Sequence, residues 1–82
     1  MTKEQIVDKL KEIFQLVVHN GVDVNVIEGS SNIRLDLGVN SVALVYMMIA
    51  IERSFGIDMR DVTYNTFTTV DDVVDYIYER VK

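Results

Sequence analysis

The stretch that decides the fold of this chain is Leu35-Asp36-Leu37-Gly38-Val39-Asn40-Ser41-Val42, a short loop that leads into a strongly apolar helix. Asn40 is a favourable N-cap residue, and nonpolar residues follow without a break from Val42 to Ile51. We therefore predict a helix that opens at Ser41 and ends at Phe55-Gly56. In its first turn the backbone amides lack intrahelical partners and the helix dipole is positive. A phosphate attached to or bound near Ser41 would be stabilised there.

This helix carries apolar residues on two sides when its positions are counted at about 100° per residue. One stripe, which we expect to face the core, consists of Leu44, Met47, Met48, Ile51 and Phe55. The other stripe, nearly opposite, consists of Val42, Val45, Tyr46, Ile49 and Arg53. A chain of 82 residues can hardly enclose a helix on all sides, so we expect the second stripe to be partly a surface for partners. The alternative is that the preceding loop covers it through Val24, Ile27 and Ile33.

Two further helices are predicted, one before and one after this helix in the sequence. The first should begin at Lys3, because Thr2-Lys3-Glu4-Gln5 has the spacing of a capping box, and it should end at Asn20-Gly21. Its apolar stripe consists of Ile6, Leu10, Ile13, Phe14 and Val17. The last helix should begin at Thr69-Val70-Asp71-Asp72, which has a similar start signal. Its stripe consists of Val70, Val73, Val74, Ile77 and Val81.

The connections between these helices are less regular. Met59-Arg60-Asp61-Val62-Thr63-Tyr64 is long enough for a short helix, with Asp58 as its cap. Between Gly21 and Asn40 apolar and polar residues alternate loosely. They fit either a loop pinned to the bundle or a hairpin through Glu28-Gly29-Ser30-Ser31, although two isolated strands are barely stable. In both readings Ser30 and Ser31 are turn formers.

These patterns predict an all-α fold, a small four-helix bundle with three main helices, a short helix over residues 59–64 and a long connection before Ser41. The chain forms a single domain over residues 1–82. It has no Cys and no Pro, so neither disulfides nor thiolate metal sites hold it together. Helix packing therefore has to supply the stability.

The composition also excludes several classes of function. With a net charge of −5 and no basic cluster, the chain would repel nucleic acid. The nonpolar run from Val42 to Ile51 is shorter than the roughly 20 residues that span a bilayer. No basic segment followed by an apolar one marks a secretory signal, so we expect the protein to be cytoplasmic. We also expect it to be a monomer.

The residues also indicate that the protein is not an enzyme. A serine nucleophile needs a base, and the only histidine, His19, falls in a different helix without an acid placed to orient it. The carboxylates fall on outward helix faces, where pairing for acid and base catalysis or for metal binding is not expected. We therefore predict no catalytic residues and no metal site.

From Leu35 onward the chain resembles the acyl carrier protein family. The shared features are Asp36-Leu37-Gly38 before Ser41, Phe55 at the end of the helix, and Thr68-Thr69-Val70 leading into Asp75-Tyr76-Ile77. In that family the serine at this helix start carries 4'-phosphopantetheine. The resemblance implies that Ser41 is the attachment site, and that the connection before Ser41 is a long loop rather than a hairpin.

The resemblance also implies what the chain does and with which partners. A phosphopantetheinyl transferase would move the arm from coenzyme A to Ser41. The arm would then carry acyl groups as thioesters to acyl-transferring and acyl-modifying enzymes of fatty acid, polyketide or related lipid biosynthesis. These partners would touch residues near the serine, namely Leu37, Val42, Val45, Tyr46, Ile49 and Glu52.

The chain departs from the family pattern at and after the motif. Asn40 and Val42 replace the usual Asp and Leu, and Ala43, Tyr46 and Arg53 stand where acidic residues are usual. Recognition should therefore depend more on hydrophobic contact and on the acids further along the chain. Two alternative functions stay open: an unmodified helical interaction subunit, and an aminoacyl or peptidyl carrier of a nonribosomal peptide pathway, for which Asp before the serine is not required.

Overall fold

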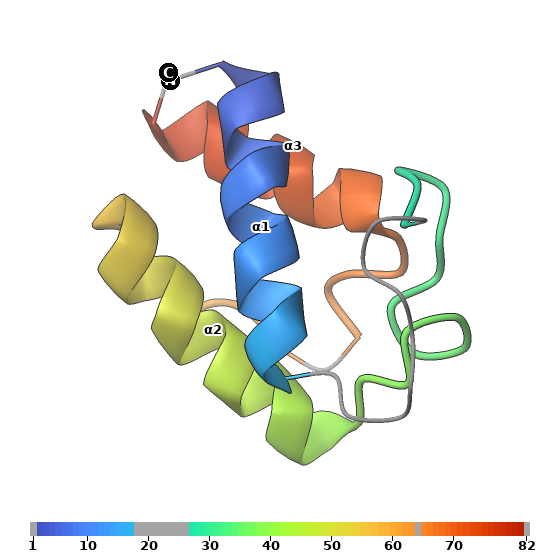
Figure 1. Cartoon of the computed structure of the whole chain (residues 1–82). Coiled ribbons are helices and arrows are strands. Elements are labelled where there is room, and N and C mark those ends of the chain that lie inside the picture. The colour runs from blue at the N-terminus through green and yellow to red at the C-terminus, as the bar shows by residue number, and fades with distance from the viewer. Residues whose placement is uncertain (1, 18–26, 64, 82) are drawn as a thin grey trace.

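The computed structural model describes residues 2–17, 27–63 and 65–81. This part of the chain contains three helices, α1 (Lys3–Val17), α2 (Ser41–Phe55) and α3 (Val70–Val81). α1 lies across the other two and packs against both (Figure 1). Within the described ranges there is no strand, only an isolated bridge between Asn32 and Thr69. The predicted all-α fold with three main helices is confirmed.

α1 begins at the predicted residue because a reciprocal capping box closes its first turn. The Thr2 amide donates to Gln5 Oε1 (2.8 Å), and the Gln5 amide donates to Thr2 Oγ1 (3.2 Å). Most of the predicted apolar stripe is buried, namely Ile6, Leu10, Ile13 and Phe14. The predicted end at Asn20-Gly21 and the predicted position of His19 lie outside the described residues.

α2 has the predicted bounds, and Gly56 ends it. Gly56 has a φ of 67°, a left-handed conformation that glycine adopts without a steric penalty, and its amide donates to the Glu52 carbonyl (2.8 Å). The stripe expected to face the core does so. Its members are either buried (Leu44, Met47 and Ile51) or half-buried against the core (Met48 and Phe55).

α3 begins with a cap made by Asp72 and Thr69. The carboxylate of Asp72 accepts hydrogen bonds from the amides of Thr68 (2.9 Å) and Thr69 (3.0 Å), while the Asp72 amide donates to Thr69 Oγ1 (3.3 Å). These backbone donors hold the pKa of Asp72 below its ordinary value. Because that pKa is lower in the folded state, the carboxylate stabilises the fold above its unfolded pKa, and this contribution is lost as pH falls through the folded value.

The described part of the predicted short helix over residues 59–64, residues 59–63, contains a turn at Arg60 and Asp61 and no helix. The Val62 amide donates to the Met59 carbonyl (3.0 Å) as in a single turn. Side chains satisfy neighbouring backbone donors: Asp58 Oδ1 accepts from the Arg60 amide (2.9 Å), and Glu52 Oε2 from the Met59 amide (3.3 Å). Such side-chain bonds compete with a helical ladder, and the predicted short helix is not confirmed.

A polar cluster attaches this turn segment to α3. The Tyr76 hydroxyl donates to Asp61 Oδ1 (2.7 Å), and the Arg80 guanidinium lies 3.5 Å from the Tyr76 ring centroid and 3.6 Å from Asp61 Oδ2. Burial and the bond to Asp61 raise the pKa of Tyr76, and the same bond lowers the pKa of Asp61. The segment is therefore held by side chains in place of a helix of its own.

The described part of the long connection, residues 27–40, is a loop whose apolar side chains enter the core. Ile33, Leu37 and Val39 are all buried, and Ile27 is half-buried against them. The Ile33 amide donates to the Thr68 carbonyl (3.0 Å), next to the bridge between Asn32 and Thr69. A loop pinned to the bundle, rather than a hairpin, is confirmed for these residues; Val24, the third residue of the covering alternative, lies outside them.

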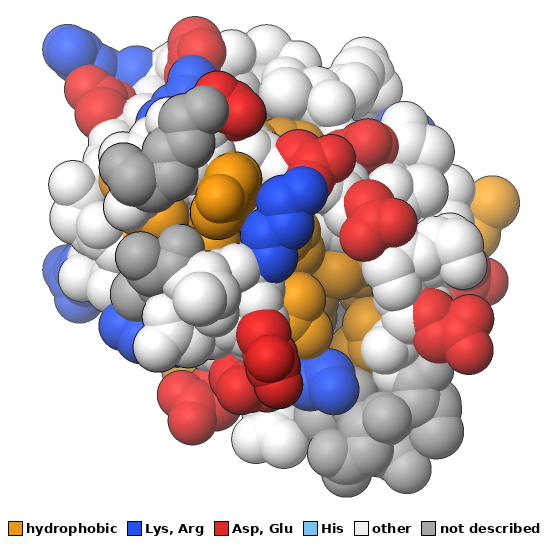
Figure 2. Space-filling model, turned by 90° about the horizontal axis from the view of Figure 1, so that it is seen from above, with side chains coloured by type: hydrophobic (Ala, Val, Ile, Leu, Met, Phe, Trp, Pro, Cys, Tyr) orange, Lys and Arg blue, Asp and Glu red, His pale blue; other side chains and the backbone are white. Residues whose placement is uncertain are grey.

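The molecule is acidic where α3 is exposed. α3 exposes Asp71, Asp72, Asp75 and Glu79 to solvent. Seen from above, acidic and basic side chains lie around apolar ones that show between them (Figure 2). Lys3 Nζ lies 3.1 Å from Asp75 Oδ1, but both side chains are more than half exposed, so this pair contributes little to stability.

Two isoleucines of α2 provide a matched test of which side faces the core. Ile51 is fully buried, whereas Ile49 is 42% exposed. We expect Ile51→Ala to lower the free energy of unfolding by about 2 to 5 kcal/mol, and Ile49→Ala to lower it by less than about 1 kcal/mol. Urea unfolding of the two variants measures both values. Equal losses would show that the side carrying Ile49 is enclosed as well.

Candidate functional site

Ser41 is the first residue of α2, and its side chain is exposed at the helix start. Asn40 caps the helix as predicted: its backbone is extended (φ −88°, ψ −176°), and its Oδ1 accepts from the Ala43 amide at 2.8 Å. The Asn40 carbonyl accepts the first helical bond, from Leu44 (2.8 Å). The serine hydroxyl is therefore presented to solvent from a helix end with fixed geometry.

The loop before the serine is locked by a second network, between Asn32 and Asp36. The Asn32 amide donates to Asp36 Oδ2 (2.7 Å), and the Asp36 amide donates back to the Asn32 carbonyl (2.9 Å). The side-chain oxygen of Asn32 accepts from the amides of Arg34 (2.9 Å) and Leu35 (2.8 Å). Asp36, the first residue of the Asp-Leu-Gly motif, thus has a structural role in closing this turn.

The next residues carry the chain from this turn to the helix. Leu37 and Val39 are buried, with Gly38 exposed between them at a φ of 68°. A side chain at that φ would be strained, which explains the glycine. The Val39 amide donates to the Ile33 carbonyl (2.9 Å). The position of Ser41 is therefore fixed by two buried side chains, those of Val39 and Leu37, which lie two and four residues before it.

The electrostatics of this helix start suit an anion. The cap engages the Ala43 amide, and the amides of Ser41 and Val42 have no hydrogen-bond partner among the described residues. The first turn of α2 contains no acidic residue. Unpaired amides at the positive end of the helix dipole can hydrogen-bond a phosphate, so the residues present fit a phosphate ester on Ser41.

The second stripe of α2 is exposed next to this site. The exposed fractions are 62% for Val42, 54% for Val45, 63% for Tyr46 and 42% for Ile49. Two large apolar residues outside the stripe are exposed too, Leu35 (84%) and Leu16 (71%). Leu35 was missed as a surface residue because it alternates with Leu37 in a loop, where no helical period tells inside from outside.

Two of the predicted partner-binding residues are placed differently. Leu37 is only 1% exposed and belongs to the core, so it is not available to a partner. Glu52 is half-buried, and its carboxylate accepts from the Met59 amide (3.3 Å). The turn closed by Asp36 precedes Leu37, and beyond this turn the chain enters the core through Leu37 and Val39.

Other kinds of site are absent from the described part of the chain. It contains no group of three or more His, Cys, Asp or Glu side chains that could hold a metal ion. None of its helices is long and apolar enough to cross a membrane. Ser41, Asn40 and the exposed stripe are thus the features that the structure brings together.

Comparison with known proteins agrees with this geometry. The family described as phosphopantetheine attachment site matches residues 8–77. The chain belongs to the acyl carrier protein family. The acyl carrier protein of Rubrobacter xylanophilus is 33% identical over 79 residues, 96% of this chain and 95% of that protein. The acyl carrier protein of Cyanidioschyzon merolae is 32% identical over 82 residues, 100% of this chain and 88% of that protein.

Membership of the acyl carrier protein family settles the general role. Acyl carrier proteins are carriers and not catalysts, and their cofactor is 4'-phosphopantetheine. The covalent arm supplies a thiol that holds an acyl group as a thioester. In this chain Ser41 presents a hydroxyl at a fixed, exposed position next to an exposed apolar stripe.

The cap residue offers a direct test of how this helix start is held. We expect Asn40→Ala to lower the free energy of unfolding by about 0.5 to 2 kcal/mol, because the Ala43 amide loses its acceptor. Asn40→Asp should leave stability nearly unchanged, since both residues cap helices well. Urea unfolding measures both. An Asn40→Ala variant as stable as the parent would contradict the role of this bond.

Proposed function

We propose that the chain is an acyl carrier protein whose 4'-phosphopantetheine arm is attached to the Oγ of Ser41. The observation that carries the proposal is an exposed serine at the capped start of α2, held by a buried loop, in a chain that matches the phosphopantetheine attachment site family. A phosphopantetheinyl transferase would form the phosphodiester with the Ser41 oxygen, using coenzyme A as donor.

The residues around Ser41 have distinct roles in this proposal. The amides of Ser41 and Val42 lie where they can bind phosphate oxygens, which offsets charge repulsion when the ester forms. Asn40 keeps the helix start intact, and Gly38 lets Leu37 and Val39 anchor the loop on both sides. The hydroxyl is therefore positioned before the transferase arrives, so that little ordering is needed on binding.

The acyl groups carried would be intermediates of fatty acid, polyketide or related lipid biosynthesis. The enzymes that load and unload them would meet the exposed stripe of α2, chiefly Val42, Val45, Tyr46 and Ile49. Because this stripe contains no acid, contact there is mainly hydrophobic. This differs from the acidic recognition that the family pattern implies, and it favours a specialised pathway with its own partner enzymes.

The attachment site is tested by mass. We expect the chain, incubated with coenzyme A and a broad-specificity phosphopantetheinyl transferase, to gain one phosphopantetheine group, located on Ser41 by peptide mapping. Ser41→Ala should gain nothing, while Ser54→Ala, a matched exposed serine at the other end of the same helix, should be modified like the parent. Modification of Ser41→Ala, or none of the parent with any transferase tried, would overturn the proposal.

Asn40 provides a test of partner choice. The transferases that serve acidic fatty acid carriers present basic side chains. Asn40 is neutral and cannot form an ion pair with them. We expect Asn40→Asp to be modified several-fold faster by such a transferase at low salt, with the difference shrinking as salt screens the interaction. Equal rates for the two proteins across a salt series would contradict this explanation of Asn40.

A further inference from the structure

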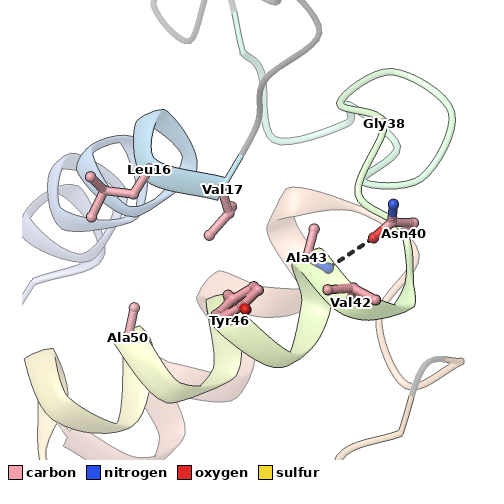
Figure 3. Close-up of a pocket in the computed structure, with 8 residues that line it drawn as sticks. All are labelled: Leu16, Val17, Gly38, Asn40, Val42, Ala43, Tyr46 and Ala50. Atoms are coloured by element: carbon pink, nitrogen blue, oxygen red, sulfur yellow. Dashed lines mark hydrogen bonds between the residues drawn. The ribbon is translucent and has the colours of Figure 1, made fainter.

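A groove runs between α1 and α2 on the outer side of the bundle. Its wider part is a hollow of about 750 Å³ next to the start of α2. It is lined by Leu16, Val17, Gly38, Asn40, Val42, Ala43, Tyr46 and Ala50. In the close-up, Leu16 and Val17 come from the end of α1, Ala43, Tyr46 and Ala50 from α2, and Gly38 and Asn40 from the loop at the head of the groove (Figure 3).

The groove continues along both helices and becomes charged. A second hollow of about 470 Å³ shares Leu16, Tyr46 and Ala50 with the first. It extends to Lys9 and Glu12 on α1 and to Arg53 in the last turn of α2. From Val42 to Arg53 the helix rises by about 16 Å, or roughly three turns. The groove is thus elongated, with apolar side chains at one end and the basic side chains of Lys9 and Arg53 at the other.

The direction of Ser41 separates this groove from the attachment site. At about 100° per residue, the side chains of Ala43, Tyr46 and Ala50 leave α2 between roughly 140° and 200° from that of Ser41. Glu52, in contrast, is only about 20° from Ser41 and faces the Met59 turn. Val42, which also lines the groove, is only about 100° from Ser41, so an arm on Ser41 starts beside the head of the groove. The arm points away from the part lined by Tyr46 and Ala50, and that part stays available while the arm is in use.

The charge at the cationic end is unusual for this chain. Among the described residues the groove is lined by Lys9 and Arg53 but by only one acid, Glu12, although the whole chain has a net charge of −5. Lys9 is held in place, since its Nζ donates to the Ser54 carbonyl (3.3 Å) and lies 5.4 Å from the centroid of the Phe55 ring. Arg53 is exposed. This end would attract carboxylates and repel the basic surfaces that suit the rest of the protein.

We propose that the α1–α2 groove binds an amphipathic helical segment of a partner protein, with apolar side chains against Leu16, Tyr46 and Ala50 and carboxylates beside Lys9 and Arg53. Its length suits three turns of helix, and small Ala43 and Ala50 let a partner backbone approach closely. This inference rests on the proposed function in one respect only, namely that the partner is an enzyme that loads or unloads the arm. The groove selects acidic partners and disfavours basic ones.

The test uses two synthetic helical peptides as probes. Both carry leucines at i, i+3, i+4 and i+7; one has glutamates in its first turn and the other has lysines at the same positions. Each is titrated into the ¹⁵N-labelled chain without its arm, and the amide shifts are followed by NMR. We expect shifts at Leu16, Tyr46 and Arg53, and about fivefold tighter binding of the glutamate peptide.

Three variants make the result specific. Arg53→Glu, at an exposed position, should reverse the order of the two peptide affinities. Lys11→Glu makes the same charge change about 160° away from Lys9 on α1 and should leave the order of affinities unchanged. Tyr46→Ser should weaken both peptides. The chain modified on Ser41 should bind the glutamate peptide as tightly as the unmodified chain does.

Several results would overturn the inference. Equal affinity for both peptides, no binding of either, or shifts away from the groove would each do so. Weaker binding after modification of Ser41 would mean that the arm itself occupies the groove. A dimer that forms on concentration and is lost in Tyr46→Ser would mean that a second copy occupies it. Only the comparison with the modified chain needs the modification; the peptide affinities are measured without it, so a failed peptide test leaves the mass test of Ser41 unaffected, and the reverse holds too.

Discussion

The burial of three loop residues, Ile33, Leu37 and Val39, is the constraint on which the rest of the structure depends. They enter the same core as the helices, and the pairing of Asn32 with Asp36 holds the turn that makes this possible. Without that turn the loop would leave the start of α2 undefined, because a single N-cap bond fixes one turn of helix but not its place on the bundle. The loop is therefore part of the core, and the exposed serine is placed by residues that a partner never touches.

The consequence for function is that α2 serves three purposes on three sides. One side packs into the core through Leu44, Met47 and Ile51. The edge that carries Ser41 faces solvent and the turn around Met59, and the remaining side, with Tyr46, borders the α1–α2 groove. A small bundle can carry an arm and still present a recognition surface only if these sides do not overlap. The spacing of residues along α2 achieves this separation.

Much of this could be predicted from the sequence, for identifiable reasons. Caps and helical periodicity are local, so the starts at Lys3, Ser41 and Val70 and the stop at Gly56 followed from residue types alone. The failures were not local. The turn in place of a helix near Met59 depends on Glu52, seven residues away, and the inward position of Leu37 depends on how the loop meets the bundle. The α1–α2 groove likewise depends on how two distant segments pack, which no periodicity within either helix reveals.

The central claim is that the loop before Ser41 is folded as firmly as the helix it introduces. Native-state amide hydrogen exchange measures this most directly, at Val39, whose amide donates to the Ile33 carbonyl, and at Leu44, whose amide donates to the Asn40 carbonyl. We expect the two amides to exchange with similar free energies of opening, because they open only when the shared core does. If Val39 exchanges like an unprotected loop amide while Leu44 stays protected, the loop does not position the serine and the account is contradicted.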